Sequence, residues 1–281
     1  MLSPEQKHIQ QQIIAELGVK SVTKAADELM RRVQFIKDYL RRSGARSLVI
    51  GISGGIDSLV VGCMAQRAVE QLRDEGLEAQ FIALRLPYGV QADAVDADAA
   101  VRHIQPDRVL SINIQAATDA VLHSLRQAGQ SFSSAGQQDF VMGNVKARQR
   151  MVMCYAVAAA NSGLVLGSDH AAEVLMGFFT KYGDGAADLM PLAGLVKEQV
   201  RDIAVQLEVP LHLIEKAPTA DLESLTPLRP DELAFGLSYK EIDAFLTGHE
   251  VSTQAFDIIL RHYRSGEHKR QLPASPLSAA H

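Results

Sequence analysis

The sequence predicts an α/β protein in which a parallel sheet is covered by helices on both faces. Four short apolar segments, at 47–52, 80–86, 108–114 and 164–167, are typical of buried strands. Segments with helical periodicity lie between them, and this alternation implies right-handed βαβ crossovers. Because 281 residues can bury one large core and no linker interrupts the pattern, we expect a single domain over residues 1–281.

Composition narrows the possible functions. Hydrophobic residues make up 47% and charged residues 22% of the chain, as in ordinary globular enzymes. The net charge of −5 provides no overall basic surface, so no nucleic-acid partner is expected. No segment approaches the roughly 18 apolar residues of a membrane span, and the N-terminus lacks a signal-peptide core. Cys63 and Cys154 lie in apolar helical patterns and are expected to be small buried residues. We therefore expect no membrane partner and a cytoplasmic location.

The first strand leads into the most informative stretch of the chain. A helix is predicted over 25–42, the strand follows, and a second helix starts at 59–65. Between strand and helix lies Ser-Gly-Gly-Ile-Asp-Ser, residues 53–58. A strand, a glycine turn and a helix N-terminus present backbone N–H groups to an anion, and glycine lets the backbone approach it closely. These six residues therefore predict a phosphate-binding loop.

Asp57 is an unusual residue in such a loop, because it places an acid where anions bind. No Gly-Lys pair occurs anywhere in the chain, which excludes a Walker A loop. An acid fits if a divalent cation lies between it and the phosphate oxygens. The alternative is a tight turn in which Asp57 and Ser58 merely begin a helix. The whole pattern between strand and helix favours the phosphate site.

Further helices are expected around the remaining strands, at 93–104, from the end of the third strand to about 127, and at 143–161. Residues 129–138 are rich in Ser, Gly and Gln, which predicts a mobile loop. Beyond about residue 178 the pattern becomes glycine-rich and then helical, and no further strand is predicted.

The fourth strand ends in Gly-Ser-Asp-His-Ala-Ala-Glu, residues 167–173. The carboxyl ends of parallel strands meet at one edge of a sheet, so Glu173 is expected to face Asp57 as a second metal ligand. A capping box is the alternative, but with Ser168 or Asp169 as N-cap the acid would have to come one or two residues earlier.

Two further segments carry polar groups suited to ligands. Residues 178–185 combine glycines with Lys181 and Asp184, a composition that suits a lid over a polar ligand. The segment is no dinucleotide fingerprint, because Asp188 stands where the third glycine would be. The long helix carries three basic residues, Lys146, Arg148 and Arg150. They form either a solvated face or a contact for a substrate phosphate.

With these residues in view, the chain resembles the ammonia-dependent NAD synthetases of the N-type ATP pyrophosphatase superfamily. The resemblance covers roughly residues 10–270 and joins the phosphate loop to several other motifs. These lie at 85–93, 143–148, 169–173, 177–185, 216–222 and 267–270. The phosphate-loop pattern identifies only the superfamily, whereas 177–185 and 217–222 are more specific.

The resemblance implies an adenine-nucleotide alpha-hydrolase-like (Rossmann-like) fold and a two-step amidation. The nicotinate carboxylate of deamido-NAD attacks the α-phosphorus of ATP, which releases pyrophosphate and leaves a mixed anhydride with AMP. Ammonia then attacks the anhydride to give NAD and AMP. Magnesium would neutralise the departing pyrophosphate. Glutamine is not expected as the direct donor, because a glutaminase module needs a nucleophilic cysteine and many more residues.

The resemblance also implies roles for individual residues. ATP would be bound by Gly51, Ile52, Ser53, Gly54, Gly55, Ile56, Asp57, Ser58, Ser168, Lys197 and Thr219. Mg²⁺ would be held by Asp57 and Glu173. Deamido-NAD would contact Arg148, Lys181, Asp188, His268 and Lys269. Asp57, Glu173 and Lys181 are the expected catalytic residues. The family's dinucleotide site lies at a two-fold interface, so a homodimer is expected.

Two departures and two rival functions accompany the resemblance. Ser168 stands where the family often has threonine, which keeps the hydroxyl, and residues 271–281 lack the family's aromatic and basic ending and are expected to form a disordered tail. One rival is another ligase of the superfamily, GMP synthetase-like or tRNA-thiolating. It is disfavoured by the buried cysteines and the acidic charge. The other is a nucleotide sensor without catalysis, disfavoured by the retained Asp57, Glu173 and Lys181.

Overall fold

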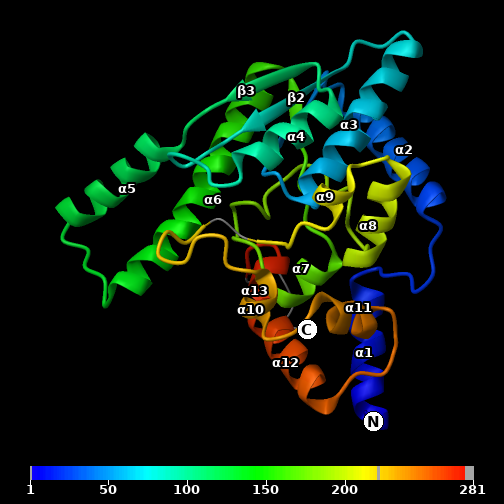
Figure 1. Ribbon diagram of the computed structural model, residues 1–281, viewed down its shortest axis with the longest axis vertical. Helices are drawn as coiled ribbons and strands as arrows, with labels where there is room; N and C mark the ends of the chain where they lie inside the picture. Colours follow the sequence, from blue (N-terminus) through cyan, green and yellow to red (C-terminus); the bar gives the residue numbers. More distant parts are fainter. Residues whose placement is uncertain (1, 220–221, 276–281) are drawn as a thin grey trace.

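The computed structural model describes residues 2–219 and 222–275 and contains a four-stranded sheet between layers of helices (Figure 1). All paired strands are parallel, in the order β3-β2-β1-β4. The strands are β1 (Ser47–Gly51), β2 (Gln80–Arg85), β3 (Arg108–Ser111) and β4 (Gly163–Val165). The predicted fold class is confirmed, although β3 ends three residues before the predicted strand does.

Both faces of the central strands are buried, which explains their continuous apolar sequence. Successive side chains of a strand point to opposite faces. Leu48 and Ile50 accordingly join one hydrophobic cluster, and Val49 between them joins another. In β2 the same alternation separates Phe81 from Ile82.

On each face of the sheet, one layer of helices packs on the strands and a second layer lies outside it (Figure 1). On one face α3 (Ile56–Asp74) packs on β1 and β2, with α4 (Ala94–Ile104) beside it. Outside α3 lie α2 (Ala25–Ser43) and α8 (Lys197–Gln206). On the other face α6 (Ala135–Ala160) packs on β1 and β4, and α5 (Gln115–Gln127) lies outside α6.

A second body of helices lies below the sheet in Figure 1 and encloses its own hydrophobic cluster. Its helices are α1 (Pro4–Glu16), α7 (Ala171–Met176), α10 (Asp231–Phe235), α11 (Tyr239–Leu246) and α12 (Thr253–Ser265). Two short helices, α9 (Leu211–Ile214) and α13 (Glu267–Arg270), complete the described elements. As predicted, the described residues beyond 178 contain no strand, only isolated bridges at Leu189, Thr219 and Pro230.

The prediction of a mobile loop at 129–138 is wrong from Ala135 onward. Helix α6 begins there, eight residues before the predicted start, and Ser134 caps it by accepting a hydrogen bond from Gln137 N at 3.1 Å. Gln138 accepts a hydrogen bond from Arg126 of α5. The glycine and glutamines at the start of α6 have the composition of a loop, but the cap and the packing against α5 make the segment helical.

Other predictions concern the cysteines, the tail and the domain count. Cys63 and Cys154 are buried as predicted, and burial raises the pKa of their thiols to about 12 and about 11. Of the predicted tail, residues 271–275 lie in no helix or strand and 276–281 lie outside the described residues. Within the described ranges, no helix is long and apolar enough to cross a membrane. The single domain stays a prediction.

Candidate active site

The site lies where the order of the sheet changes direction. From β1 the chain continues to β2 on one side, and it later returns to β4 on the other side of β1. The carboxyl ends of β1 and β4 are therefore a topological switch point, the usual ligand position in such sheets. A cavity of about 460 Å³ opens there. The predicted ATP residues that line it are Gly51, Ile52, Ser53, Gly55, Ile56, Asp57, Ser58, Ser168, Lys197 and Thr219.

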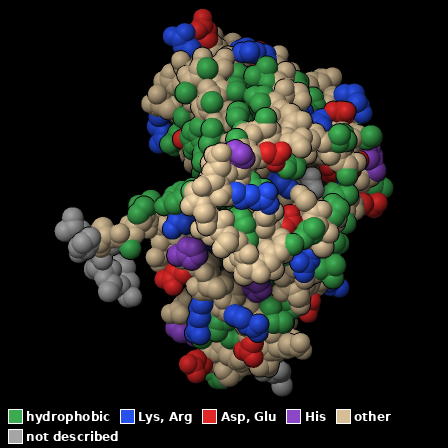
Figure 2. Space-filling view, turned by 90° about the vertical axis from the view of Figure 1, so that its left-hand side faces the viewer, with side chains coloured by type: hydrophobic (Ala, Val, Ile, Leu, Met, Phe, Trp, Pro, Cys, Tyr) green, Lys and Arg blue, Asp and Glu red, His purple; other side chains and the backbone are tan. Residues whose placement is uncertain are grey.

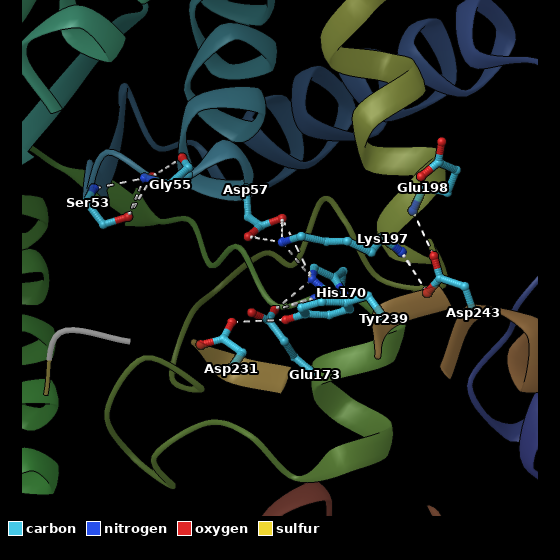
Figure 3. A network of polar contacts seen from close by, with 11 residues as sticks. Ser53, Gly55, Asp57, His170, Glu173, Lys197, Glu198, Asp231, Tyr239 and Asp243 are labelled. Atoms are coloured by element: carbon cyan, nitrogen blue, oxygen red, sulfur yellow. Dashed lines mark hydrogen bonds and ion pairs between the residues drawn. The ribbon is translucent and has the colours of Figure 1, made fainter. Parts of the chain in front are cut away.

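The phosphate loop forms a tight turn from β1 into α3. Gly54 has φ +94°, a conformation that favours glycine, and Gly55 is the N-cap residue of α3. The hydroxyl of Ser53 accepts a hydrogen bond from Gly55 N at 3.1 Å and lies 3.2 Å from the hydroxyl of Ser58 (Figure 3). The loop thus presents the N-terminus of a long helix to the cavity, an arrangement suited to an anion.

Asp57 forms an ion pair with Lys197 at the wall of this cavity (Figure 3). The Lys197 ammonium donates to the two carboxylate oxygens at 2.8 and 2.7 Å. Burial alone would raise the pKa of Asp57, but the charge of Lys197 and its hydrogen bonds outweigh it and hold the pKa below its ordinary value. Asp57 is therefore ionised at neutral pH.

The position of Lys197 is fixed by α11, a helix of the body below the sheet. It is the first residue of α8, and the carboxylate of Asp243 accepts hydrogen bonds from the N–H groups of Lys197 and Glu198 at 3.1 and 2.8 Å. This cap from α11 satisfies N–H groups that a helix start leaves open. The ring of Tyr239 lies 5.1 Å from the ammonium, which it stabilises by a cation–π contact.

Glu173 lies next to Asp57, as predicted, and His170 completes the group. Their ligand atoms all lie within 4.8 Å of one another. His170 Nε2 is 3.7 Å from Asp57 and 3.4 Å from Glu173. Burial and then the charge of Asp57 raise the pKa of Glu173 well above its ordinary value, while burial and Lys197 lower that of His170 to about 3. Two adjacent carboxylates beside a neutral imidazole fit a divalent cation, and the carboxylate oxygens are donors that Mg²⁺ prefers.

The prediction that Glu173 has no capping role is wrong. Helix α7 begins after His170, and Glu173 accepts a hydrogen bond from His170 N at 3.2 Å. The N-cap is therefore His170 rather than Ser168 or Asp169, which puts Glu173 in register. The cap aims the Glu173 carboxylate toward Asp57, so capping and metal binding are compatible roles.

Four of the five predicted deamido-NAD residues gather around the segment 177–185. Arg148 donates to the carbonyl of Lys181 at 3.2 Å, and the Lys181 ammonium donates to the carbonyl of His268 at 2.5 Å. Lys269 donates to the carbonyls of Gly177 and Phe179 at 2.8 and 2.9 Å and lines the cavity. Asp188 makes none of these contacts, because its carboxylate accepts a hydrogen bond from Val165 N at the end of β4.

The three basic residues of α6 do not form a cluster. Lys146 is 4% exposed and donates to the carbonyl of Leu222 and the hydroxyl of Ser224, and Arg150 donates to the carbonyl of Leu86. Neither predicted alternative therefore holds for the three together. Residues two apart on a helix point to different sides, which separates Arg148 from its neighbours.

Comparison with known proteins decides the family. The model of the NAD synthase family matches residues 28–273. The chain belongs to the NAD synthase family. It is 51% identical over 273 residues to the NH(3)-dependent NAD(+) synthetase of Burkholderia lata, with 97% of each chain covered.

Solved structures agree with this assignment. The NAD+ synthetase of Burkholderia pseudomallei has a TM-score of 0.84 at 48% identity, with 97% of this chain and 100% of that chain covered. The NMN synthetase of Francisella tularensis has a TM-score of 0.79 at 34% identity, with 91% and 100% covered. The Rossmann-like fold predicted from the resemblance is confirmed. As a member of this family the enzyme is a ligase that forms a C–N bond and uses ATP.

Several members of the polar network had no predicted role. Asp231 lines the cavity and accepts a hydrogen bond from the hydroxyl of Tyr239 at 3.1 Å. Tyr239 also packs against the rings of His170 and Phe235. These residues begin short helices far along the chain, and their local sequence shows only helix starts. His170 could have been found, because it precedes Glu173 by three residues at a strand end.

Proposed function

We propose that this cavity is where the enzyme brings ATP, deamido-NAD and ammonia together. The overall reaction is the ATP-dependent, ammonia-dependent amidation of deamido-NAD, which yields NAD, AMP and pyrophosphate. The observation that supports the cavity as its site is the convergence of the phosphate loop, the Asp57–Lys197 pair and Glu173 at one switch point.

ATP is proposed to lie with its phosphates on the N-terminus of α3. The first residues of α3 offer backbone N–H groups, which stabilise phosphate charge. Ser168 and Thr219, on the cavity wall, offer hydroxyl groups. Lys197 lines the same cavity, and its ammonium can share its positive charge between Asp57 and the departing pyrophosphate.

Mg²⁺ is proposed to be held by Asp57 and Glu173, with the neutral His170 at its side. When bound, the ion supplies positive charge that stabilises the pyrophosphate leaving group. The chain contributes the two carboxylates, the cap that orients Glu173, and the Lys197 charge that keeps Asp57 ionised.

Deamido-NAD is proposed to bind around the segment 177–185. Arg148, Lys181, His268 and Lys269 concentrate basic groups there, and its two phosphates and its carboxylate are anionic. Asp188 remains proposed as a fifth contact. Lys181 is the proposed catalytic residue, because its ammonium is hydrogen-bonded within this basic group and because it belongs to the loop beside the cavity.

A homodimer is proposed because hydrophobic side chains lie exposed around α6. Figure 2 shows hydrophobic side chains gathered over the upper part of one face. On α6, Phe140 is 59% and Val152 46% exposed, and Val109 of the edge strand β3 is 46% exposed. Exposed apolar groups of this kind are typical of a contact surface. Light scattering that gives twice the 30.5 kDa chain mass would support the dimer, and the mass of one chain would contradict it.

The free buried thiols fit the proposed cytoplasmic location.

One assay tests the function and its substrate together. The protein is incubated with ATP, Mg²⁺ and ammonium, and with either deamido-NAD or the acid form of NMN, and the products are quantified. We expect equal amounts of NAD and AMP from deamido-NAD, with much less amidation of the mononucleotide. Absence of NAD and AMP would contradict the function, and preference for the mononucleotide would contradict the substrate.

A pair of variants on one helix tests the metal role. Asp57→Ala should lower kcat at least about 100-fold, because charge stabilisation of the leaving group is lost. Asp74→Ala, at the exposed far end of α3, is the control and should leave kcat unchanged. Glu173→Gln should raise the Mg²⁺ concentration needed for half-maximal activity. Retention of more than about a tenth of the activity by Asp57→Ala would contradict the role of Asp57.

A further inference from the structure

Two carbonyl groups of the phosphate loop are held by side chains from other segments. The amide of Gln91 donates to the carbonyl of Ser53 at 2.8 Å. The ammonium of Lys216 donates to the carbonyl of Gly54 at 3.2 Å. Gln91 lies between β2 and α4, and Lys216 follows α9, so both connections are bonded to the turn after β1.

Asp93 joins these two side chains to each other. One of its oxygens accepts a hydrogen bond from Gln91 at 2.8 Å, and the other accepts one from Lys216 at 2.5 Å. Lys216 also forms an ion pair with Asp96 at 2.9 Å. The side chains of Asp93 and Lys216 are only 13% and 18% exposed, so water competes little for their bond.

The start of α4 also lies directly against the loop. A Cβ added at Gly54 would lie 2.8 Å from Ala97 N, closer than real Cβ atoms approach a backbone nitrogen. With φ +94°, Gly54 is confined by its backbone conformation and by this contact. The loop is therefore held by a hydrogen bond from Gln91, a hydrogen bond from Lys216 and a close contact with Ala97.

Holding a carbonyl also fixes the amide beyond it. A trans peptide is planar, and its C=O and N–H groups point in opposite directions. Lys216 therefore fixes the N–H of Gly55, which points to the Ser53 hydroxyl at 3.1 Å on the cavity wall (Figure 3). Gln91 in the same way fixes the N–H of Gly54.

We infer that Asp93, Gln91 and Lys216 form a clamp that fixes the backbone of the phosphate loop in the shape that receives the phosphates of ATP. Lys216 is then a positioning residue: it acts on ATP through the Gly54–Gly55 peptide. This inference rests on the proposed ATP site. The alternative is a direct contact between Lys216 and a phosphate. The two arrangements predict opposite effects on ATP binding when Asp93 is replaced.

Asp93→Asn provides the decisive test. The change keeps the shape of the side chain and removes a negative charge near the phosphates. If Lys216 bound phosphate directly, freeing it from Asp93 would leave ATP binding unchanged or tighten it. If the clamp positions the loop, binding weakens. We expect Asp93→Asn and Lys216→Met each to raise the Kd of a non-hydrolysable ATP analogue about tenfold, measured by titration calorimetry without deamido-NAD.

Further measurements separate positioning from loss of structure. The double variant should bind the analogue about as weakly as either single variant, because both changes break one clamp. Lys216→Arg should recover part of the affinity. The KM for deamido-NAD should stay close to that of the wild type, and the melting temperature should fall by no more than a few degrees. Lys240→Met, on the exposed side of α11, should bind the analogue like the wild type.

Each of the following results would contradict the clamp, either alone or together with the ATP site. An Asp93→Asn variant that binds the analogue within twofold of the wild type, or more tightly, would overturn the clamp and leave the ATP site standing. Effects of Asp93→Asn and Lys216→Met that multiply in the double variant would also overturn it. Wild-type protein that fails to bind the analogue, or that binds it equally well after Gly54→Ala, would overturn the proposed ATP site and the clamp with it.

Discussion

The ammonium of Lys197 lies within 2.8 Å of both carboxylate oxygens of Asp57, and the lysine side chain is 1% exposed. The phosphate loop is thus joined to α8 by an ion pair across 140 residues of sequence. Both residues line the cavity, but the Lys197 side chain is almost fully buried, so solvent screens the pair mainly from the side of Asp57. Both residues must be charged for the site to have its present shape.

Removing the lysine should therefore destabilise the fold as well as slow the reaction. In Lys197→Met the carboxylate of Asp57 remains beside Glu173 without its cation. We expect the free energy of unfolding to fall by roughly 2 kcal/mol, less than the ~3–5 kcal/mol of a fully buried pair because Asp57 faces the cavity. Urea unfolding measures the loss. The double variant Asp57→Asn/Lys197→Met should lose less than the two single variants added together, and equal stability of Lys197→Met and wild type would contradict the importance of the pair.

Two glycines with positive φ provide a matched comparison. Gly54 and Gly44 have φ +94° and +69°, but an added Cβ meets Ala97 N at Gly54 and nothing within 4 Å at Gly44. Gly44→Ala should cost about 1–2 kcal/mol of stability and leave the KM for ATP unchanged. Gly54→Ala should in addition displace the loop and raise the KM for ATP at least about tenfold. Steady-state kinetics at varied ATP decides this, and an equal KM in both variants would show that the close contact with α4 is unimportant.

The ion pair between Asp93 and Lys216 predicts how stability depends on pH. Burial raises the pKa of Asp93, but hydrogen bonds from Lys216 and Gln91 lower it below its ordinary value. Such a group stabilises the fold above the unfolded pKa of about 4, and the contribution is lost as the pH falls through the folded pKa. Burial lowers the pKa of Lys216 but its bonds to Asp93 and Asp96 raise it overall, so its contribution is lost only above about pH 10.

The wild type should accordingly be more stable than Asp93→Asn by a constant amount, about 1 kcal/mol, between about pH 5 and pH 9. The difference should shrink below about pH 4. Urea unfolding of both proteins across this range measures it. A difference that grows on acidification would mean that the sign assigned to Asp93 is wrong.

The two thiols should be unreactive in the folded enzyme. Both are 7% exposed, and raised pKa values keep them protonated at pH 8. A chromogenic disulfide reagent should modify neither within minutes in native protein and both in denaturant. Cys154 lines the cavity, so a saturating ATP analogue provides the control. A thiol that reacts at the rate of free cysteine, and is protected by the analogue, would show that Cys154 is accessible from the cavity.

Much of the site follows from local sequence. The apolar segments before Ser53 and Gly167 mark two strands of one parallel sheet, and their carboxyl ends must meet. This is why the proximity of Asp57 and Glu173 was predictable before any contact was known. The start of α6 was not, because glycine and glutamine hide a helix whose stability comes from a cap and from packing on α5.

The partners of these residues depend on tertiary structure instead. No pattern near Lys197 indicates Asp57, since the pair forms only when Asp243 caps α8 and places the lysine. Likewise, Lys146 and Arg148 are close in sequence, but the helix separates their side chains. Spacing along the chain predicts which residues share a strand end, whereas contacts between helices decide what each side chain touches.

The site residues lie on elements that pack in two hydrophobic clusters, one against the sheet and one among the helices below it. This has a consequence for inactivation by heat. The phosphate loop belongs to the sheet, but Glu173 comes from α7 and Lys197 is positioned by α11, both packed in the helical cluster below the sheet. Opening of that smaller cluster alone would separate Glu173 from Asp57 and remove the Asp243 cap from the start of α8, although α8 itself packs against α3. The temperature at which activity disappears therefore reports on the helices, and the sheet can outlast the enzyme.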